Sequence, residues 1–110
     1  MAQKIKSVTL RFVPSGSPDV VEYKLYYEKV GTDVTHDSES VTLGNPDPDA
    51  TTGKIHIDVS ALGVFTDGRY NIGIAAVDDA GNESALSKKA DVPFDFIAPD
   101  APGEIQVVAI

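Results

Sequence analysis

The sequence predicts an all-β protein built as an antiparallel β-sandwich, and three observations support this. Apolar and polar residues alternate with a period of two along most of the chain, as they do in strands with one buried face. Turns rich in glycine and proline separate these runs at short, regular spacing. No long segment carries a helical apolar stripe, because β-branched residues and glycine interrupt each candidate.

The expected strands follow one another in chain order. The first holds Val8, Leu10 and Phe12 in alternation and ends at Pro14. Further strands are expected over 21–28, around 41–43, and over 55–59, 70–77 and 87–94. The segment 44–49 contains two prolines, which cannot donate to a central ladder, so it is expected to be a loop.

A single sheet would leave one apolar face in water, so two sheets are expected to share one core. The residues expected in that core are Val8, Leu10, Phe12, Tyr23, Leu25, Ile55, Ile57, Ile72 and Ile74.

Length and composition restrict the function. The chain has 110 residues, the size of one domain, and no cysteine for disulfides or thiol chemistry. Its formal net charge of −8 argues against nucleic acid and anionic membrane surfaces as partners. No apolar run reaches transmembrane length, and no signal-peptide core opens the sequence. The compartment stays open: a cell-surface or extracellular setting is favoured, with virion or cytoplasm as alternatives.

Residues 5–94 resemble the fibronectin type III family. Val8 to Pro14 is similar to its strand B, with Phe12 in place of the usual tryptophan, and Tyr23 to Tyr27 is similar to strand C. Leu62, Gly68 and Tyr70 resemble its core leucine, turn glycine and corner tyrosine, and residues 70–84 resemble strand F and the FG turn of bacterial members. The resemblance implies an immunoglobulin-like sandwich in which the Tyr70 hydroxyl bonds to nearby backbone.

No catalytic residue, metal site or cofactor is expected, and the chain is not expected to be an enzyme. His36 and His56 are interpreted as solvated surface side chains. Asn45, Asp47 and Asp49 alternate as calcium ligands do, but the loop lacks the tight-turn glycine and the bidentate glutamate.

Two surfaces are candidates for binding. One is the acidic FG loop, for which a plain tight turn is the simpler interpretation. Its candidate residues are Asp78, Asp79, Asn82 and Glu83. The other is Tyr26, expected to point outward beside Gly73 and Ala75, either covering the glycine or offering an aromatic platform to a sugar.

The two ends of the chain suggest a mode of assembly. Residues 1–96 are expected to form the sandwich, and residues 97–110 read as a proline-rich linker plus a strand resembling strand A of a following module. Strand A itself is not recognisable ahead of strand B, so the edge beside Val8 and Leu10 is expected to be open. Ile105, Val107 and Ala109 could then pair with that edge by strand exchange; the alternative is a free tail.

The sequence thus predicts a noncatalytic structural or interaction module, serving as a spacer, adhesion or assembly unit of a bacterial surface, secreted or virion protein. The alternative is a carbohydrate- or protein-binding module that uses the FG loop or the Tyr26 face. The expected partners are neighbouring domains, another protein or a second copy of the chain, with no membrane insertion.

Overall fold

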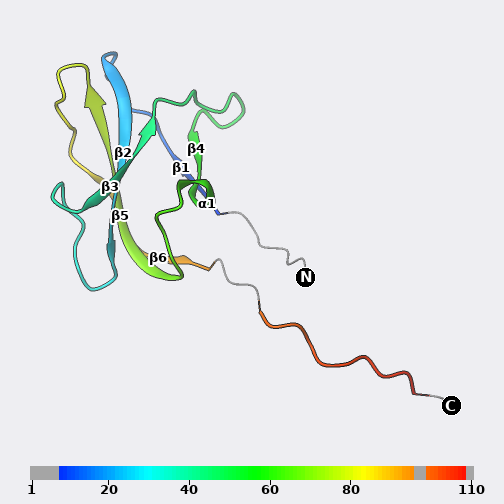
Figure 1. Cartoon of the computed structure of the whole chain (residues 1–110). Helices are drawn as coiled ribbons and strands as arrows, with labels where there is room; N and C mark the ends of the chain where they lie inside the picture. The colour runs from blue at the N-terminus through cyan, green and yellow to red at the C-terminus, as the bar shows by residue number, and fades with distance from the viewer. Residues whose placement is uncertain (1–7, 96–98, 109–110) are drawn as a thin grey trace.

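The computed structural model describes residues 8–95 and 99–108, and most of its regular structure is strand (Figure 1). The all-β prediction is confirmed, since each expected strand is present. In chain order the elements are β1 (Thr9–Phe12), β2 (Val20–Lys29), β3 (Glu39–Gly44), β4 (Ile55–Asp58), α1 (Val59–Leu62), β5 (Gly68–Asp78) and β6 (Ser87–Phe94).

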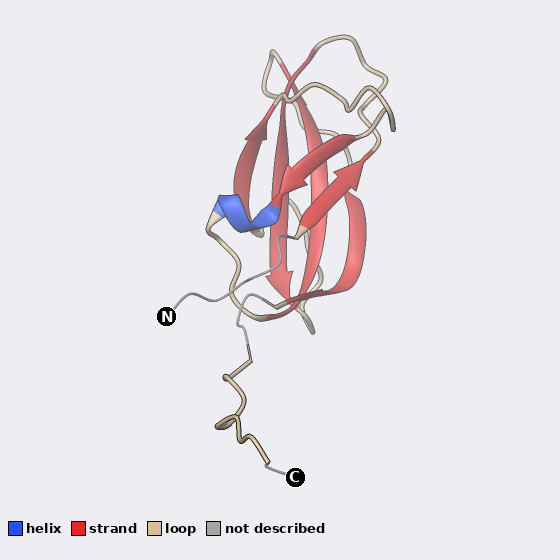
Figure 2. Ribbon diagram, turned by 90° about the vertical axis from the view of Figure 1, so that its right-hand side faces the viewer, coloured by secondary structure: helices blue, strands red, loops and turns tan. Residues whose placement is uncertain are grey.

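The strands form two antiparallel sheets (Figure 2). The smaller sheet pairs β1 with β4, and the larger has the order β3-β2-β5-β6. The register of the small sheet runs from Thr9 opposite Asp58 to Phe12 opposite Ile55. Within the described ranges, β1 and β6 are therefore edge strands of different sheets.

The inner faces of the two sheets share an apolar core. Tyr23 of β2 packs with Ile55 and Ile57 of β4, which joins the sheets. Leu25 at 0% and Ile55 at 1% exposure are among its most buried side chains. Of the predicted core residues, Tyr23, Leu25, Ile55, Ile57 and Ile72 are buried, whereas Val8, Leu10, Phe12 and Ile74 are only half-buried. Full burial of that second group was predicted, and the prediction is wrong because the sheets do not close over them beside β1.

The alternation in β2 is broken near its start. Val20 pairs with Asp78 and Glu22 with Val77, so one extra residue, Val21, bulges from the ladder. Val21 is consequently 50% exposed, and Val20 packs beside the Tyr23 cluster instead.

Two local interactions fix the conformation of the segment that connects β4 to β5. Asp58 caps α1 by accepting a hydrogen bond from the Ser60 backbone N–H at 3.0 Å, and Gly63 ends the helix in the left-handed region at φ 69°. The Tyr70 hydroxyl oxygen then accepts a hydrogen bond from the Thr66 backbone N–H at 3.3 Å. The predicted bond between this tyrosine and nearby backbone is confirmed.

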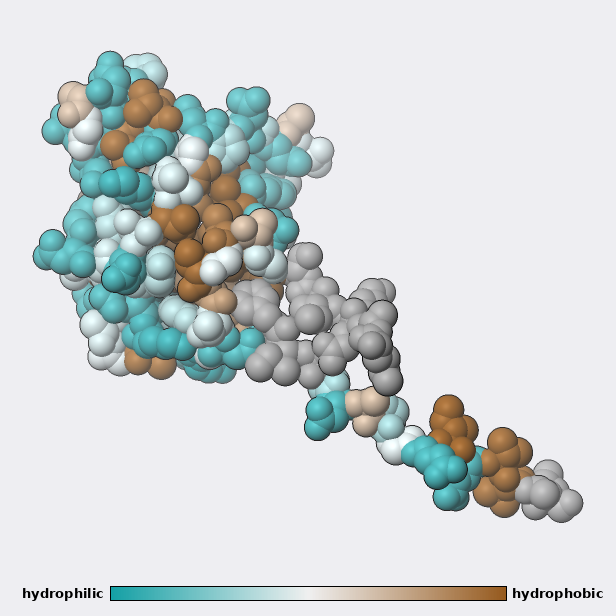
Figure 3. Space-filling model, viewed as in Figure 1, coloured by the Kyte–Doolittle hydropathy of each residue, from teal (hydrophilic) through white to brown (hydrophobic). Residues whose placement is uncertain are grey.

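Residues 99–108 are exposed throughout and carry no regular secondary structure. Ile105, Val107 and Val108 are 90%, 94% and 84% exposed. Figure 3 shows apolar side chains, in brown, along a segment that extends away from the body of the molecule. In the part of the chain that the structure describes, no helix has the length and apolar character needed to cross a bilayer.

Candidate functional site

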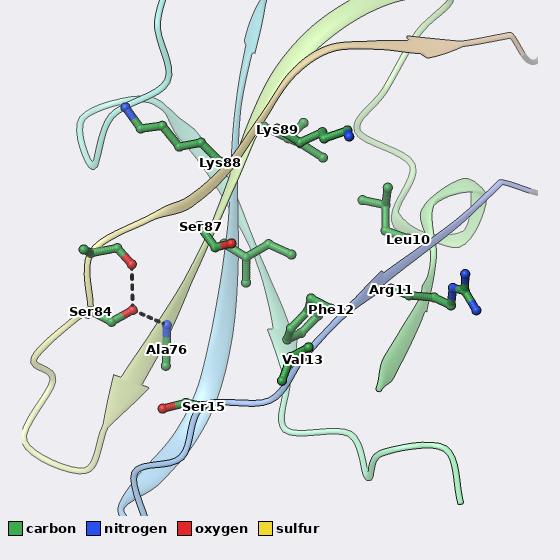
Figure 4. Close-up of a pocket in the computed structure, with 13 residues that line it drawn as sticks. Leu10, Arg11, Phe12, Val13, Ser15, Ala76, Ser84, Ser87, Lys88 and Lys89 are labelled. Carbon is green, nitrogen blue, oxygen red and sulfur yellow. Dashed lines mark hydrogen bonds between the residues drawn. The ribbon is translucent and has the colours of Figure 1, made fainter. Parts of the chain in front are cut away.

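A groove of about 570 Å3 lies between β1 and β6, where the two sheets are not joined (Figure 4). Its apolar lining comes from Leu10 and Phe12 on β1 and from Ile72 and Ile74 on β5. Figure 4 shows Leu10 and Phe12 projecting from β1 toward the groove, with Ser87 of β6 on the opposite wall. The groove exists because the half-buried face of β1 extends beyond the cover that β6 provides.

The backbone of β1 is bonded on one side only within the described residues. The Val8 carbonyl accepts from the Val59 N–H at 2.9 Å, so Val8 bonds toward the β4 side. Hydrogen-bonded and non-hydrogen-bonded pairs alternate in an antiparallel ladder, so Leu10 and Phe12 also bond toward β4. The N–H and C=O groups of Thr9 and Arg11 therefore point to the other side, beside the groove, where an added strand would find them.

Basic side chains stand on the rim of this apolar groove. Arg11, Lys88 and Lys89 all line it, although the chain as a whole carries a formal charge of −8. Lys88 also forms an ion pair with Asp33 at 3.2 Å. Arg11 and Lys89 therefore supply the positive charge beside the open backbone groups, since Lys88 is paired with Asp33.

A smaller cavity of about 240 Å3 continues the groove toward the FG turn. Ser15, Ala76 and Ser84 line both spaces. Asp78, Asn82 and Glu83 line the smaller one, so part of the predicted FG-loop site lies at the end of the groove.

Asp78 is used by the turn itself. Its carboxylate accepts from the backbone N–H groups of Ala80 at 3.0 Å and Asn82 at 2.8 Å. The hydrogen bond from the Asn82 side chain has the largest effect in lowering the pKa of Asp78, and these backbone donors lower it further. This supports the simpler interpretation of the loop as a turn motif, while Asp79 and Asn82 remain exposed at its tip.

Tyr26 lies opposite Gly73, as predicted, but it is not an exposed platform. Its side chain is 3% exposed and packs with Val34, Ala75 and Leu86 on the outer face of the large sheet. The alternative of an aromatic platform for a sugar is therefore wrong, because residues 34 and 86 come from loops that fold over the ring.

The Tyr26 hydroxyl donates a hydrogen bond to the Glu83 carboxylate, which also lies 3.6 Å from the Lys24 ammonium. Burial, followed by the hydrogen bond and charge of Glu83, raises the pKa of Tyr26 to about 12. The same hydroxyl, with a smaller effect of Lys24, lowers the pKa of Glu83. Glu83 thus anchors the FG turn to β2.

The two histidines and the acidic loop after β3 form hydrogen bonds within the fold. His36 Nε2 lies 2.9 Å from the Ser84 carbonyl, and His56 Nε2 lies 3.0 Å from the Thr52 hydroxyl. The Asp49 carboxylate accepts from the Thr51 and Thr52 N–H groups at 2.8 and 3.0 Å, which shapes the loop after β3. Among the described residues, no group of three or more His, Cys, Asp or Glu side chains is placed to hold a metal ion.

Within the described residues β1 has no partner on its outer side, as predicted, but the sequence did not predict the groove behind it. The wall formed by Ser84 to Lys89 depends on how β6 is displaced from β1, which alternation does not encode. Of the strand-exchange residues, Ile105 and Val107 are exposed, and Ala109 lies outside the described residues.

No protein-family model, curated protein or solved structure matches this chain.

Proposed function

We propose that the chain is a noncatalytic assembly module with a fibronectin type III-like sandwich, and that it accepts an extended strand at the outer edge of β1. The observation that carries this proposal is the side-by-side placement of the Thr9 and Arg11 backbone groups and the apolar groove. An added strand would form hydrogen bonds with these backbone groups, and its side chains would fill the groove, as in β-augmentation.

The strand pairing supports the fold assignment. In immunoglobulin-type sandwiches, strands B and E share one sheet, and strands C, F and G share the other. β1, which resembles strand B, pairs with β4; β2 and β5, which resemble strands C and F, pair with each other. Strand A lies beside strand B in that arrangement, on the side where the groove is found.

The polar side chains support a structural function. Asp49 and Asp78 bind turn backbone, and Glu83 holds Tyr26. Each of these carboxylates stabilises a connection between strands. The setting in a bacterial surface, secreted or virion protein stays a prediction.

The test uses the full chain and a panel of synthetic nine-residue peptides in which valine, isoleucine or leucine alternates with threonine, glutamine or serine. We expect at least one peptide to bind and to slow amide exchange at Thr9 and Arg11. Arg11→Pro removes one outward N–H without touching the β4 ladder, so it should abolish binding. Arg11→Ala keeps that N–H and should bind normally.

Binding that survives Arg11→Pro would contradict the proposal, because the peptide would then lie elsewhere. The absence of binding by every peptide up to about 1 mM would also contradict it.

A further inference from the structure

We propose that the strand accepted at the β1 edge is the segment 104–108 of a second copy of this chain. This inference rests on the proposed function and names the partner of the same site. It predicts that the protein assembles by intermolecular strand donation.

The segment has the pattern of a strand with one buried face. Ile105 and Val107 alternate with Glu104 and Gln106, and both apolar side chains are at least 90% exposed. Nothing in the described part of the chain covers them. Two exposed branched side chains on one face match a groove whose lining is apolar.

The backbone arrangement of β1 restricts how the segment can pair. Thr9 and Arg11 present their backbone groups outward, so their opposite residues form the hydrogen-bonded pairs. Ile105 and Val107 then lie opposite inward-facing β1 residues such as Leu10, with their side chains in the groove. Glu104 or Gln106 lies opposite Arg11, on the solvent side.

The charges of the two partners are complementary. Arg11 and Lys89 line the groove, while the Lys88 ammonium is paired with Asp33. The segment from 97 to 110 contains Asp100 and Glu104 and has no lysine, arginine or histidine. Attraction between the rim and the segment would offset the repulsion expected between two copies of a chain with a charge of −8.

The position of β6 favours donation between copies. Phe94, at the end of β6, belongs to the cluster against which Val8 and Leu10 pack, so β6 ends near the start of β1. A segment that runs antiparallel to β1 enters at the other end, near Val13. In one chain, residues 95–103 would first have to travel back along the groove, a path that a second copy avoids.

The experiment measures mass by light scattering over a range of concentrations for the full chain and two matched variants. Val107→Asp and Val108→Asp introduce the same charge at adjacent positions outside the folded body, where the parent side chains are 94% and 84% exposed. We expect the parent chain and Val108→Asp to exceed the monomer mass as concentration rises. We expect Val107→Asp to weaken assembly at least about tenfold, since only Val107 enters the groove.

A mixing step tests the acceptor side. Val107→Asp has an intact groove, and Arg11→Pro has an intact donor segment, so each alone should be monomeric. Their equimolar mixture should form a complex of two chains and stop there, because only one groove and one segment are functional.

Equal behaviour of Val107→Asp and Val108→Asp, or a parent chain that stays monomeric, would overturn this inference, even if the Arg11→Pro chain does not fold. If the parent chain stays monomeric but binds a peptide at the β1 edge, the proposed function would still hold. The donor strand would then come from another protein. A parent chain that neither assembles nor binds any peptide would contradict both proposals.

Discussion

At the residue scale, the side chain that departs most from its sequence pattern is Tyr26. Alternation places it on the outer face of the large sheet, and the structure agrees. Yet its side chain is 3% exposed, because Val34 and Leu86 enclose it and Glu83 accepts a hydrogen bond from its hydroxyl. Period-two patterning gives the face of a residue but not whether a loop covers that face.

Tyr26→Phe should therefore destabilise the fold by about 2 kcal/mol near neutral pH, the magnitude of a hydrogen bond to a charged group. The pKa of Glu83 is lowered from 4.5 by this bond, so the contribution is complete above about pH 4.5. It is lost as the pH falls through the lowered pKa. Denaturant unfolding at several pH values measures the difference between the two chains.

The matched control is Tyr26→Phe in a Glu83→Gln background. Its effect should be smaller and should not change between pH 7 and pH 3. A difference between the parent chain and Tyr26→Phe that is independent of pH would show that Glu83 is not the acceptor.

Phe12 gives a second prediction at this scale. Its ring meets the Tyr23 ring edge-on at 5.0 Å but is only half-buried, since it also lines the groove. Phe12→Ala should cost about 2 kcal/mol in the monomer, less than the roughly 3–5 kcal/mol of a fully buried phenylalanine. Val13→Ala, at a residue that is 73% exposed, should change stability by less than about 0.5 kcal/mol.

These free energies are measured by urea unfolding at low protein concentration. A loss above about 3 kcal/mol for Phe12→Ala would mean that the groove is covered within one chain.

At the scale of elements, the packing of the loop before β6 on β5 explains why Gly73 lies at the centre of a strand. A Cβ atom at this position would stand 3.1 Å from Leu86 Cδ1 and 3.2 Å from Leu86 Cβ. The glycine therefore lets the loop before β6 lie flat on β5 and complete the cover over Tyr26.

Gly73→Ala should displace Leu86 and destabilise the fold by about 1 kcal/mol, the lower range for overpacking. Gly103→Ala is the control, because a Cβ atom there meets nothing within 4 Å. Thermal unfolding of both variants measures the effect. A stabilised Gly73→Ala would indicate that Leu86 does not rest on β5.

Much of the fold could be predicted from the sequence because each strand has its own alternation. The strand positions follow from these local patterns, whereas the bond of the Tyr70 hydroxyl to nearby backbone was implied by the resemblance. The bulge at Val21 and the helix α1 could not be predicted, since each depends on how neighbouring segments meet. The groove could not be predicted either, because it depends on the relative position of two edge strands, which is set by tertiary packing.

At the scale of the whole molecule, the proposed donor and acceptor surfaces lie on different parts of the chain. The proposed acceptor is the edge of β1, and the proposed donor is the exposed segment 104–108. Contacts between unlike surfaces produce chains or rings, whereas a reciprocal exchange produces a closed dimer. In either arrangement the sheet of β1 and β4 gains a third strand, so stability should rise with protein concentration.

The most direct test of the central claim is residue-resolved amide hydrogen exchange of the full chain at low and high concentration. The Leu10 amide, which bonds toward β4, should be protected at both concentrations. The Thr9 and Arg11 amides should exchange quickly at low concentration and become protected at high concentration, and the Val107→Asp chain should not show this change. Protection of Thr9 and Arg11 that is independent of concentration, or fast exchange at every concentration, would contradict the account.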